Sequence, residues 1–190
     1  TENRDHAAFE KIIIKNTGVS IDVRVGKDYS ITLKGDEKWT KKTLTEVEGG
    51  ALVISRENNK KKNINFNSDN QIIITMPKFT GLEVYGAVAA EISGIDSDKV
   101  KFEINGAGNI EVSGQCGSLT VELNGAGNFE GRDFKCKDVE VDIGGAGNAE
   151  IYASQSADLD IGGFGNIDVY GKPKDVKKDK HLFSNITIHD

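Results

Sequence analysis

The feature that most constrains this chain is a glycine-rich phrase that recurs four times between residues 105 and 169. The copies read NGAGNIEV, NGAGNFEG, GGAGNAEI and GGFGNIDV, and a degraded fifth copy, YGAVAAEI, precedes them at residues 85–92. Equivalent glycines are spaced 20, 19, 20 and 18 residues apart. A fixed period near 20 residues indicates stacked copies of one supersecondary unit. These marker glycines are Gly86, Gly106, Gly125, Gly145 and Gly163.

Apolar and polar residues alternate on both sides of each marker glycine. The segments before the last four glycines are residues 100–104, 119–123, 139–143 and 157–161, and the alternation resumes after each glycine. A period of two predicts strands with one buried face. Each repeat is therefore expected to contain a strand, a glycine-rich bend, a second strand and a looser connection such as Ser113–Ser118. No helical pattern in the repeats is long enough for a crossover helix.

Stacking is the way in which such units can bury their apolar faces. We therefore predict an all-β, right-handed parallel β-helix, or β-solenoid, with about 20 residues per repeat in residues 80–170. A meander of antiparallel hairpins in a sandwich or barrel is the competing architecture. In the solenoid, the bend glycines allow sharp turns and close approach of neighbouring coils, and the asparagines stack as an amide ladder. These bend residues are Gly106, Gly108, Asn109, Gly125, Gly127, Asn128, Gly145, Gly147, Asn148, Gly163, Gly165 and Asn166.

The whole chain, residues 1–190, is predicted to form a single β-helical domain. Residues 9–79 lack the repeat and are expected to form irregular strands, either as early coils or as a cap; residues 80–171 hold the repeats, and residues 172–190 form a C-terminal cap. We expect residues 1–8 to be a frayed leader and Asn58–Asn63 to be an exposed loop. The last strand is expected at Leu182–Ile188, after a charged stretch at Lys174–His181. Strands in the first part are expected at Lys11–Lys15, Val19–Val25, Tyr29–Lys34, Ala51–Ser55 and Ile72–Met76.

The repeated GAG bends, together with the upstream phrases FEKIIIKN, GGALVIS and IIITMP, resemble the putative auto-transporter adhesin, head GIN domain family of bacteria. The resemblance runs from about Phe9 to Pro173. It implies an exported β-helical protein, common in Bacteroidetes, that acts in adhesion at the cell surface or elsewhere in the envelope, outer membrane-associated or periplasmic. Resemblance to adhesin heads also suggests a homotrimer. The family offers no catalytic residues to transfer, and Val88 and Ala89 depart from its pattern.

Acidic residues recur at two fixed distances from the marker glycines. In-register stacking would arrange them in two columns of carboxylates about 4.8 Å apart, which repel one another. Three explanations remain open: outward charges that keep a flat sheet soluble, binding of Ca²⁺ between successive carboxylates, or recognition of a cationic or polyhydroxylated partner. The residues three before each glycine are Glu83, Glu103, Glu122, Asp142 and Asp160, and those five after it are Glu91, Glu111, Glu130, Glu150 and Asp168.

The sequence gives no dedicated metal or catalytic motif. The phrase at 144–152 resembles the nonapeptide of calcium β-rolls, but Ala149 occupies the aspartate position and the acid is shifted to the opposite face of the strand. No histidine lies near the cysteines, so no metal site or cofactor is predicted. The acids are many and equivalent, whereas glycosidic cleavage needs one distinct pair. We therefore predict a non-catalytic binding protein with an extended acidic sheet face; the alternatives are a polysaccharide-acting enzyme and a structural envelope protein without a ligand.

The net charge and the lengths of the apolar runs limit the classes of partner that the chain can bind. The formal net charge of −6 argues against nucleic acid and anionic membrane surfaces, and no apolar run approaches the length of a membrane span. A glycan or protein surface of the host or envelope remains as the partner. Tyr152 and Tyr170 occupy equivalent positions after their glycines, where they would form a platform for sugar rings or shield an edge or an oligomer contact.

The two cysteines, Cys116 and Cys136, also occupy equivalent places on adjacent repeats. Stacked strands bring their Cα atoms within the range of a disulfide. The spacing permits this bridge without requiring it, and two free thiols are the alternative.

Overall fold

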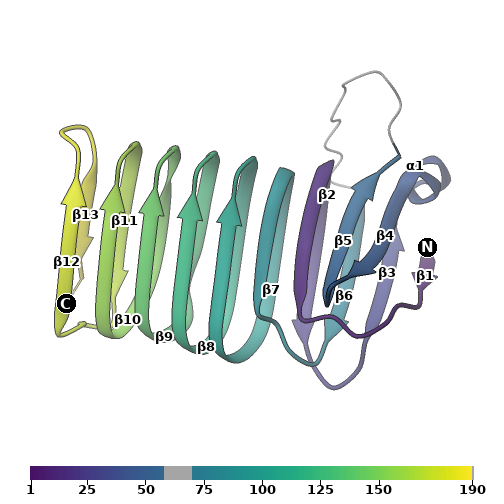
Figure 1. Ribbon diagram of the computed structural model, residues 1–190, viewed down its shortest axis with the longest axis horizontal. Coiled ribbons are helices and arrows are strands. Elements are labelled where there is room, and N and C mark those ends of the chain that lie inside the picture. Colours follow the sequence, from purple (N-terminus) through teal and green to yellow (C-terminus); the bar gives the residue numbers. More distant parts are fainter. Residues whose placement is uncertain (58–69, 190) are drawn as a thin grey trace.

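The computed structural model describes residues 1–57 and 70–189 and confirms the predicted β-solenoid. The chain is 75% strand and 3% helix, and it forms about 5 turns with roughly 20 residues per turn. Figure 1 shows the coils side by side along one long axis. Strands nearest the viewer run upward, the chain returns behind them, and it advances toward the C-terminal end, which is a right-handed path. The loop expected at Asn58–Asn63 lies outside the described residues.

Four long strands make the regular part of the solenoid. They are β7 (Gly81–Ile104), β8 (Ala107–Leu123), β9 (Ala126–Ile143) and β10 (Ala146–Ile161), and each pairs in parallel with the next. The antiparallel meander is therefore wrong for these repeats. We call the side formed by residues just before the marker glycines face A, and the side formed by residues just after them face B.

A column is the set of residues at one position in successive coils, and the inward-facing columns build the core. One such column contains Ile104, Leu123, Ile143 and Ile161, each at most 1% exposed. Face B supplies the opposing wall, with Phe102 and Phe129 in edge-to-face contact across the core at 5.0 Å between ring centroids. The buried hydrophobic residues form one continuous cluster from Phe9 to Ile186.

The marker glycines lie where the backbones of adjacent coils approach closely. A Cβ atom on Gly125 would lie 1.8 Å from the carbonyl oxygen of Gly106, and one on Gly145 would lie 1.9 Å from that of Gly125. Gly86, in the degraded copy, meets the oxygen of Thr17 in the same way at 2.2 Å. No side chain fits in this space, so the sequence must have glycine here for the coils to stack.

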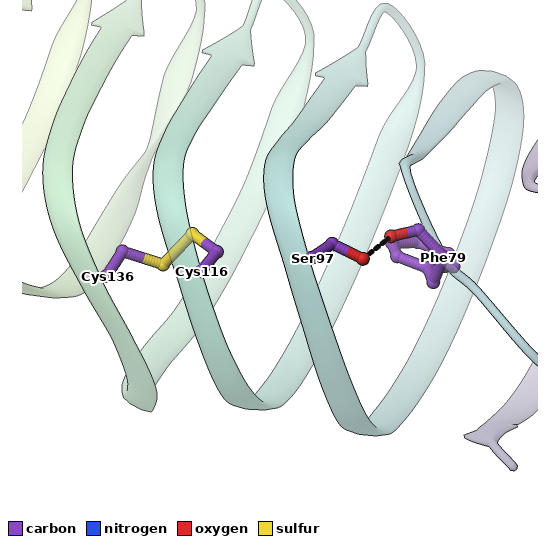
Figure 2. Close-up of a disulfide and its surroundings, with 4 residues drawn as sticks. All are labelled: Phe79, Ser97, Cys116 and Cys136. Atoms are coloured by element: carbon purple, nitrogen blue, oxygen red, sulfur yellow. Dashed lines mark hydrogen bonds between the residues drawn. A yellow bond between two sulfur atoms is a disulfide. The ribbon is translucent and has the colours of Figure 1, made fainter.

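The connection expected at Ser113–Ser118 is not loose, and that prediction was wrong. These residues belong to β8 and pair in parallel with β9, after a register shift between Glu111 and Gly114. A bulge absorbs the mismatch between the repeat lengths, and backbone pairing then resumes. Cys116 and Cys136 are paired here and form a disulfide with a Cα–Cα distance of 4.5 Å. Figure 2 shows this bridge beside Ser97, which occupies the same column one coil earlier and donates a hydrogen bond to the Phe79 carbonyl oxygen at 2.8 Å.

The N-terminal region supplies both early coils and a cap. Strand β2 (Lys11–Val25) pairs in parallel with β7 on one side, and with β5 (Ala51–Arg56) and β6 (Gln71–Met76) on the other. Beyond them, β4 (Thr43–Glu48) and β3 (Ser30–Lys34) run antiparallel to β5 and β6. The helix α1 (Glu37–Lys42), which the sequence analysis did not predict, is N-capped by Asp36.

Residues 1–8 do not form a frayed leader throughout, because β1 (Glu2–Arg4) pairs antiparallel with β3. Arg4 anchors this segment by donating hydrogen bonds to the carbonyl oxygens of Thr40 and Thr43. The charged side chain of Arg4 therefore stabilises the N-terminal cap.

At the other end, three strands complete the stack. Strand β11 (Phe164–Tyr170) pairs with the first half of β10, β12 (Asp175–Lys180) pairs with its second half, and β13 (Asn185–Ile188) pairs with β11. The expected final strand therefore begins at Asn185 and not at Leu182. The charged stretch is itself largely a strand, because parallel backbone pairing with β10 does not require apolar side chains.

Candidate functional site

The acidic residues that precede the marker glycines form a column on face A. Glu103, Glu122, Asp142 and Asp160 are in register on consecutive coils, and Asp179 extends the row. Lysines neutralise its first part. Lys101 lies 3.3 Å from Glu103 and 2.9 Å from Glu122, and Lys11 pairs with Glu83.

The pKa shifts on face A follow this uneven pairing. A hydrogen bond from Asn105, supported by Lys101, lowers the pKa of Glu103. Burial raises the pKa of Asp142, and the neighbouring carboxylates Asp160 and Glu122 raise it further. The second half of the face A column therefore has like charges that no cation in the described part of the chain compensates.

The acidic residues that follow the glycines form a longer column on face B. It is in register over six coils, and its two end members have positively charged or titratable neighbours: Asp22 pairs with Arg24 at 2.7 Å, and Asp168 pairs with His189 at 2.7 Å. The four glutamates between them have no ion pair within the described part of the chain. The column consists of Asp22, Glu91, Glu111, Glu130, Glu150 and Asp168.

An asparagine column lies beside this acidic column, two residues earlier in each strand. Asn128 donates a side-chain hydrogen bond to Asn109 at 3.1 Å, Asn148 donates to Asn128 at 3.0 Å, and Asn166 donates to Asn148 at 2.8 Å. Asn128 and Asn148 thus each donate one N–H and accept from the next asparagine, and the Asn148 oxygen also accepts from the Asn166 backbone N–H at 3.2 Å. Asn185 continues the register beyond Asn166.

The two columns line a shallow groove of about 420 Å³ on face B. Its walls are amides and carboxylates, with Thr187 at the C-terminal end and no basic residue among those lining it. Such a surface offers many hydrogen-bond acceptors and a smaller number of amide donors in a fixed array. It can bind a cationic or polyhydroxylated partner. The lining acids and amides are Asn128, Glu130, Asn148, Glu150, Asn166, Asp168 and Asn185.

Tyr152 and Tyr170 are in register but do not form an open platform. The Lys135 ammonium lies 4.1 Å from the centroid of the Tyr152 ring, and Arg132 lies 4.4 Å from that of Tyr170. His189 stacks on Tyr170 with 4.5 Å between ring centroids. Because neighbouring side chains occupy the ring faces, stacking of sugar rings there would require these side chains to move.

A larger hollow of about 630 Å³ runs over the disulfide on the side opposite the glycine bends. Both signs of charge line it, with Asp96 and Asp98 on one coil and Lys135 and Lys137 two coils further. The lack of one dominant charge makes it a less defined site than the face B groove.

The carboxylate columns are not arranged as a metal centre. Among the described residues, no three or more histidine, cysteine, aspartate or glutamate side chains are grouped so that they could hold a metal ion. The described part also has no helix that is both long and apolar enough to cross a membrane.

Three members of these columns were not predicted from the sequence, and one of them, Asp179, lies in the charged stretch before the expected last strand. Asp22 lies in Ile21-Asp22-Val23, which has the same alternation as Ala90-Glu91-Ile92, but no GAG phrase precedes it to mark the register. Asn185 follows a bend without glycine. The alternation itself was the available signal, although it does not fix which coil a strand joins.

These observations define a β-solenoid whose polar columns repeat from coil to coil. Residues 8–173 match the family described as putative auto-transporter adhesin, head GIN domain, and the chain belongs to that family. Comparison with curated proteins gives no match.

Solved structures share the fold at low sequence identity. A putative adhesin from Bacteroides fragilis NCTC 9343 is 22% identical with a TM-score of 0.77, over 99% of this chain and 95% of that one. A putative adhesin from Parabacteroides merdae ATCC 43184 is 12% identical with a TM-score of 0.51, over 100% of this chain and 95% of that one. At these identities the likeness establishes the architecture.

Proposed function

We propose that this chain is an exported, non-catalytic adhesion protein that binds a cationic or polyhydroxylated partner through face B at the bacterial cell surface. The family and the names of its structural neighbours support an adhesion role. The observation that carries the choice of face is the run of four glutamates, Glu91 to Glu150, that form no ion pair with residues 1–57 or 70–189 and lie beside the asparagine column.

Face B is favoured over face A because of what neutralises each column. On face A, Lys11 and Lys101 already engage Glu83, Glu103 and Glu122. A partner there would have to displace these lysines. On face B the carboxylates repel one another by about 1 kcal/mol per neighbouring pair in water, more at lower dielectric. A bound cation, or a donor-rich glycan, would relieve this repulsion.

The repetition of the surface suits multivalent contact. Equivalent carboxylates and amides recur about every 4.8 Å along the axis. A polymeric partner that contacts one coil weakly can contact the next coils at a high effective concentration, which multiplies the overall affinity. Adhesion needs this kind of binding and requires no bond to be broken.

The proposal is tested by two charge-matched variants. The first changes face B with Glu111→Gln, Glu130→Gln and Glu150→Gln. The second makes the same charge change on face A with Glu83→Gln, Glu103→Gln and Glu122→Gln, whose carboxylates are already paired with Lys11 and Lys101. Binding is measured on a glycan array and to soluble polylysine, at low and at physiological salt. We expect the face B variant to lose at least about tenfold in affinity and the face A variant to lose little, since unpaired acids contribute most to charge-dependent binding.

Equal losses in both variants would leave face B without a special role. Turnover of any polysaccharide on the array, abolished by a single carboxylate substitution, would replace adhesion by the enzyme alternative. Absence of any ligand from the native envelope would favour a structural role. We also propose the trimer that the resemblance implies, which sedimentation equilibrium of the full chain tests directly.

A further inference from the structure

The C-terminal end of the solenoid exposes large apolar side chains at the tip of a turn. The turn spans His181–Ser184 and is closed by a hydrogen bond from the Ser184 backbone N–H to the His181 carbonyl oxygen at 3.2 Å. Leu182 is 96% exposed and Phe183 is 81% exposed. Phe164, 64% exposed, lies in the bend one coil earlier, where β11 begins. Single exposed apolar residues are ordinary, but a group of three at one corner indicates a contact surface.

Basic residues surround this apolar tip. Residues 172–183 contain five lysines against two aspartates, in a chain with a net charge of −6. Lys178 and Lys180 stand in inward-facing columns, in register with Leu159 and Ile161, and both are exposed because no coil among the described residues covers them. The end of the stack is therefore basic and apolar, whereas faces A and B have acidic columns.

A second copy of the chain fits this end poorly. Two such ends brought together would oppose lysines at the positions where a continuing sheet needs apolar residues, and inward-pointing charges of this kind block edge pairing. The acidic face B would attract the lysines, but the groove that it offers is lined by amides and carboxylates. Leu182 and Phe183 would gain little apolar contact there, because the one apolar side chain in its lining, Phe129, is only 1% exposed.

We propose that this end docks on an anionic lipid surface. Lipid phosphates would pair with the lysines, and Leu182 and Phe183 would enter the boundary of the acyl region, which is how combined basic and apolar elements bind membranes. The net charge of the whole chain does not prevent this, because charges further than about 8 Å away are largely screened at physiological salt. End-on docking leaves faces A and B free along the sides, and it does not depend on the function proposed for face B.

Sedimentation with vesicles tests the proposal. The full chain is mixed with vesicles of phosphatidylcholine plus phosphatidylglycerol, and with vesicles of phosphatidylcholine alone. We expect binding to the anionic vesicles that weakens as salt is raised. Leu182→Ser with Phe183→Ser should weaken it by about tenfold or more, from the lost burial of two large apolar side chains. Lys178→Glu with Lys180→Glu should remove the preference for phosphatidylglycerol.

Matched controls lie at the opposite end. Tyr29→Ser with Leu44→Ser changes two partly exposed apolar residues, and Lys34→Glu with Lys38→Glu changes two exposed lysines; both should bind as the unaltered chain does. Each variant is checked by thermal melting. A Phe183→Trp variant adds a local reporter, and its emission should shift to the blue with anionic vesicles.

Three results would overturn the proposal. One is no sedimentation of the unaltered chain with anionic vesicles at low salt. Another is sedimentation that decreases as much in the N-terminal control variants as in the C-terminal variants, or sedimentation without a change in the emission of the Phe183→Trp variant. The third is self-association that Leu182→Ser with Phe183→Ser abolishes while vesicles are not bound, which would assign the tip to a second copy.

Discussion

Replacing Gly125 by alanine tests whether close approach of the bends holds the coils in register. The added Cβ would lie 1.8 Å from the Gly106 carbonyl oxygen, 2.8 Å from its carbonyl carbon and 3.1 Å from its nitrogen. All three atoms are backbone, so no side-chain rotation can relieve the overlap. The two coils must separate locally by more than about 1 Å to restore ordinary contact, since a packed interior yields little.

The expected loss in the free energy of unfolding follows from the contacts that separating the two coils would disturb. Overpacking in a well-packed region costs about 1–3 kcal/mol. Separation at this point also stretches the hydrogen bonds from Gly125 N–H to the Ile104 oxygen and from Ala126 N–H to the Gly106 oxygen, both 3.0 Å. Each such bond contributes about 1 kcal/mol. We therefore expect Gly125→Ala to lower the free energy of unfolding by about 3 kcal/mol or more.

Urea unfolding followed by circular dichroism measures this loss, with Gly162→Ala as the control. Gly162 lies in an equivalent bend, but its added Cβ would meet nothing nearer than the Asp160 Oδ1 atom at 3.9 Å, and its φ lies outside the left-handed region. That substitution should be neutral or stabilise by about 0.4–1 kcal/mol through the unfolded state. Should the two variants unfold at the same urea concentration with the same slope, close approach of the bends would not be what requires glycine there.

Three further changes probe the stack. Cys116→Ser with Cys136→Ser should lower stability by about 3 kcal/mol, since the cysteines are 20 residues apart and closing such a loop restricts the unfolded chain; an unchanged melting temperature would contradict this. Asp142→Asn should raise stability at pH 7 by a few tenths of a kcal/mol, as for a screened surface charge. Folding raises the pKa of Asp142 above its ordinary value of 3.8, so protonation of Asp142 stabilises the folded state. This stabilisation is complete below pH 3.8 and is lost as pH rises through the folded pKa. The gain from Asp142→Asn should therefore disappear below pH 3.8, and a gain that persists there would refute the raised pKa. Asn148→Ala removes a donated and two accepted hydrogen bonds of the amide column and should cost about 1–2 kcal/mol, measured by urea unfolding; a loss no larger than that of Gln115→Ala, at an exposed amide that makes no side-chain hydrogen bond with the described residues, would show that the column adds nothing.

The repeats could be predicted in detail because one physical requirement governs all of them. Backbone close approach demands glycine at the same point of each coil, and strand alternation then determines which face every later residue occupies. This is why the registers of Glu111 with Glu130 and of Cys116 with Cys136 follow from counting alone. The bond between the cysteines did not follow, since stacking permits either state.

The two ends of the solenoid were harder to anticipate. A cap has no repeating neighbour, so its elements depend on tertiary contacts that local sequence does not report. The helix α1 is only six residues long, and β12 has lysines where earlier coils place leucine and isoleucine. The alternation of apolar and polar residues does not reveal such a strand, because its inward-facing side chains are covered by a neighbouring coil on one side and meet solvent on the other.

The difference in ion pairing between the two acidic columns could not be predicted from the sequence, and it bears most directly on function. The bend glycines and the core columns determine the register, so the charged residues on the outward faces can differ between face A and face B without a change of fold. On face A, Lys101 reaches two carboxylates of successive coils and reduces their repulsion. On face B, the positions beside Glu111 and Glu130 have asparagine, which cannot neutralise a carboxylate. The repulsion between the face B carboxylates is therefore left uncompensated by the described residues, and a partner that supplies positive charge or hydrogen-bond donors would gain binding energy from relieving it.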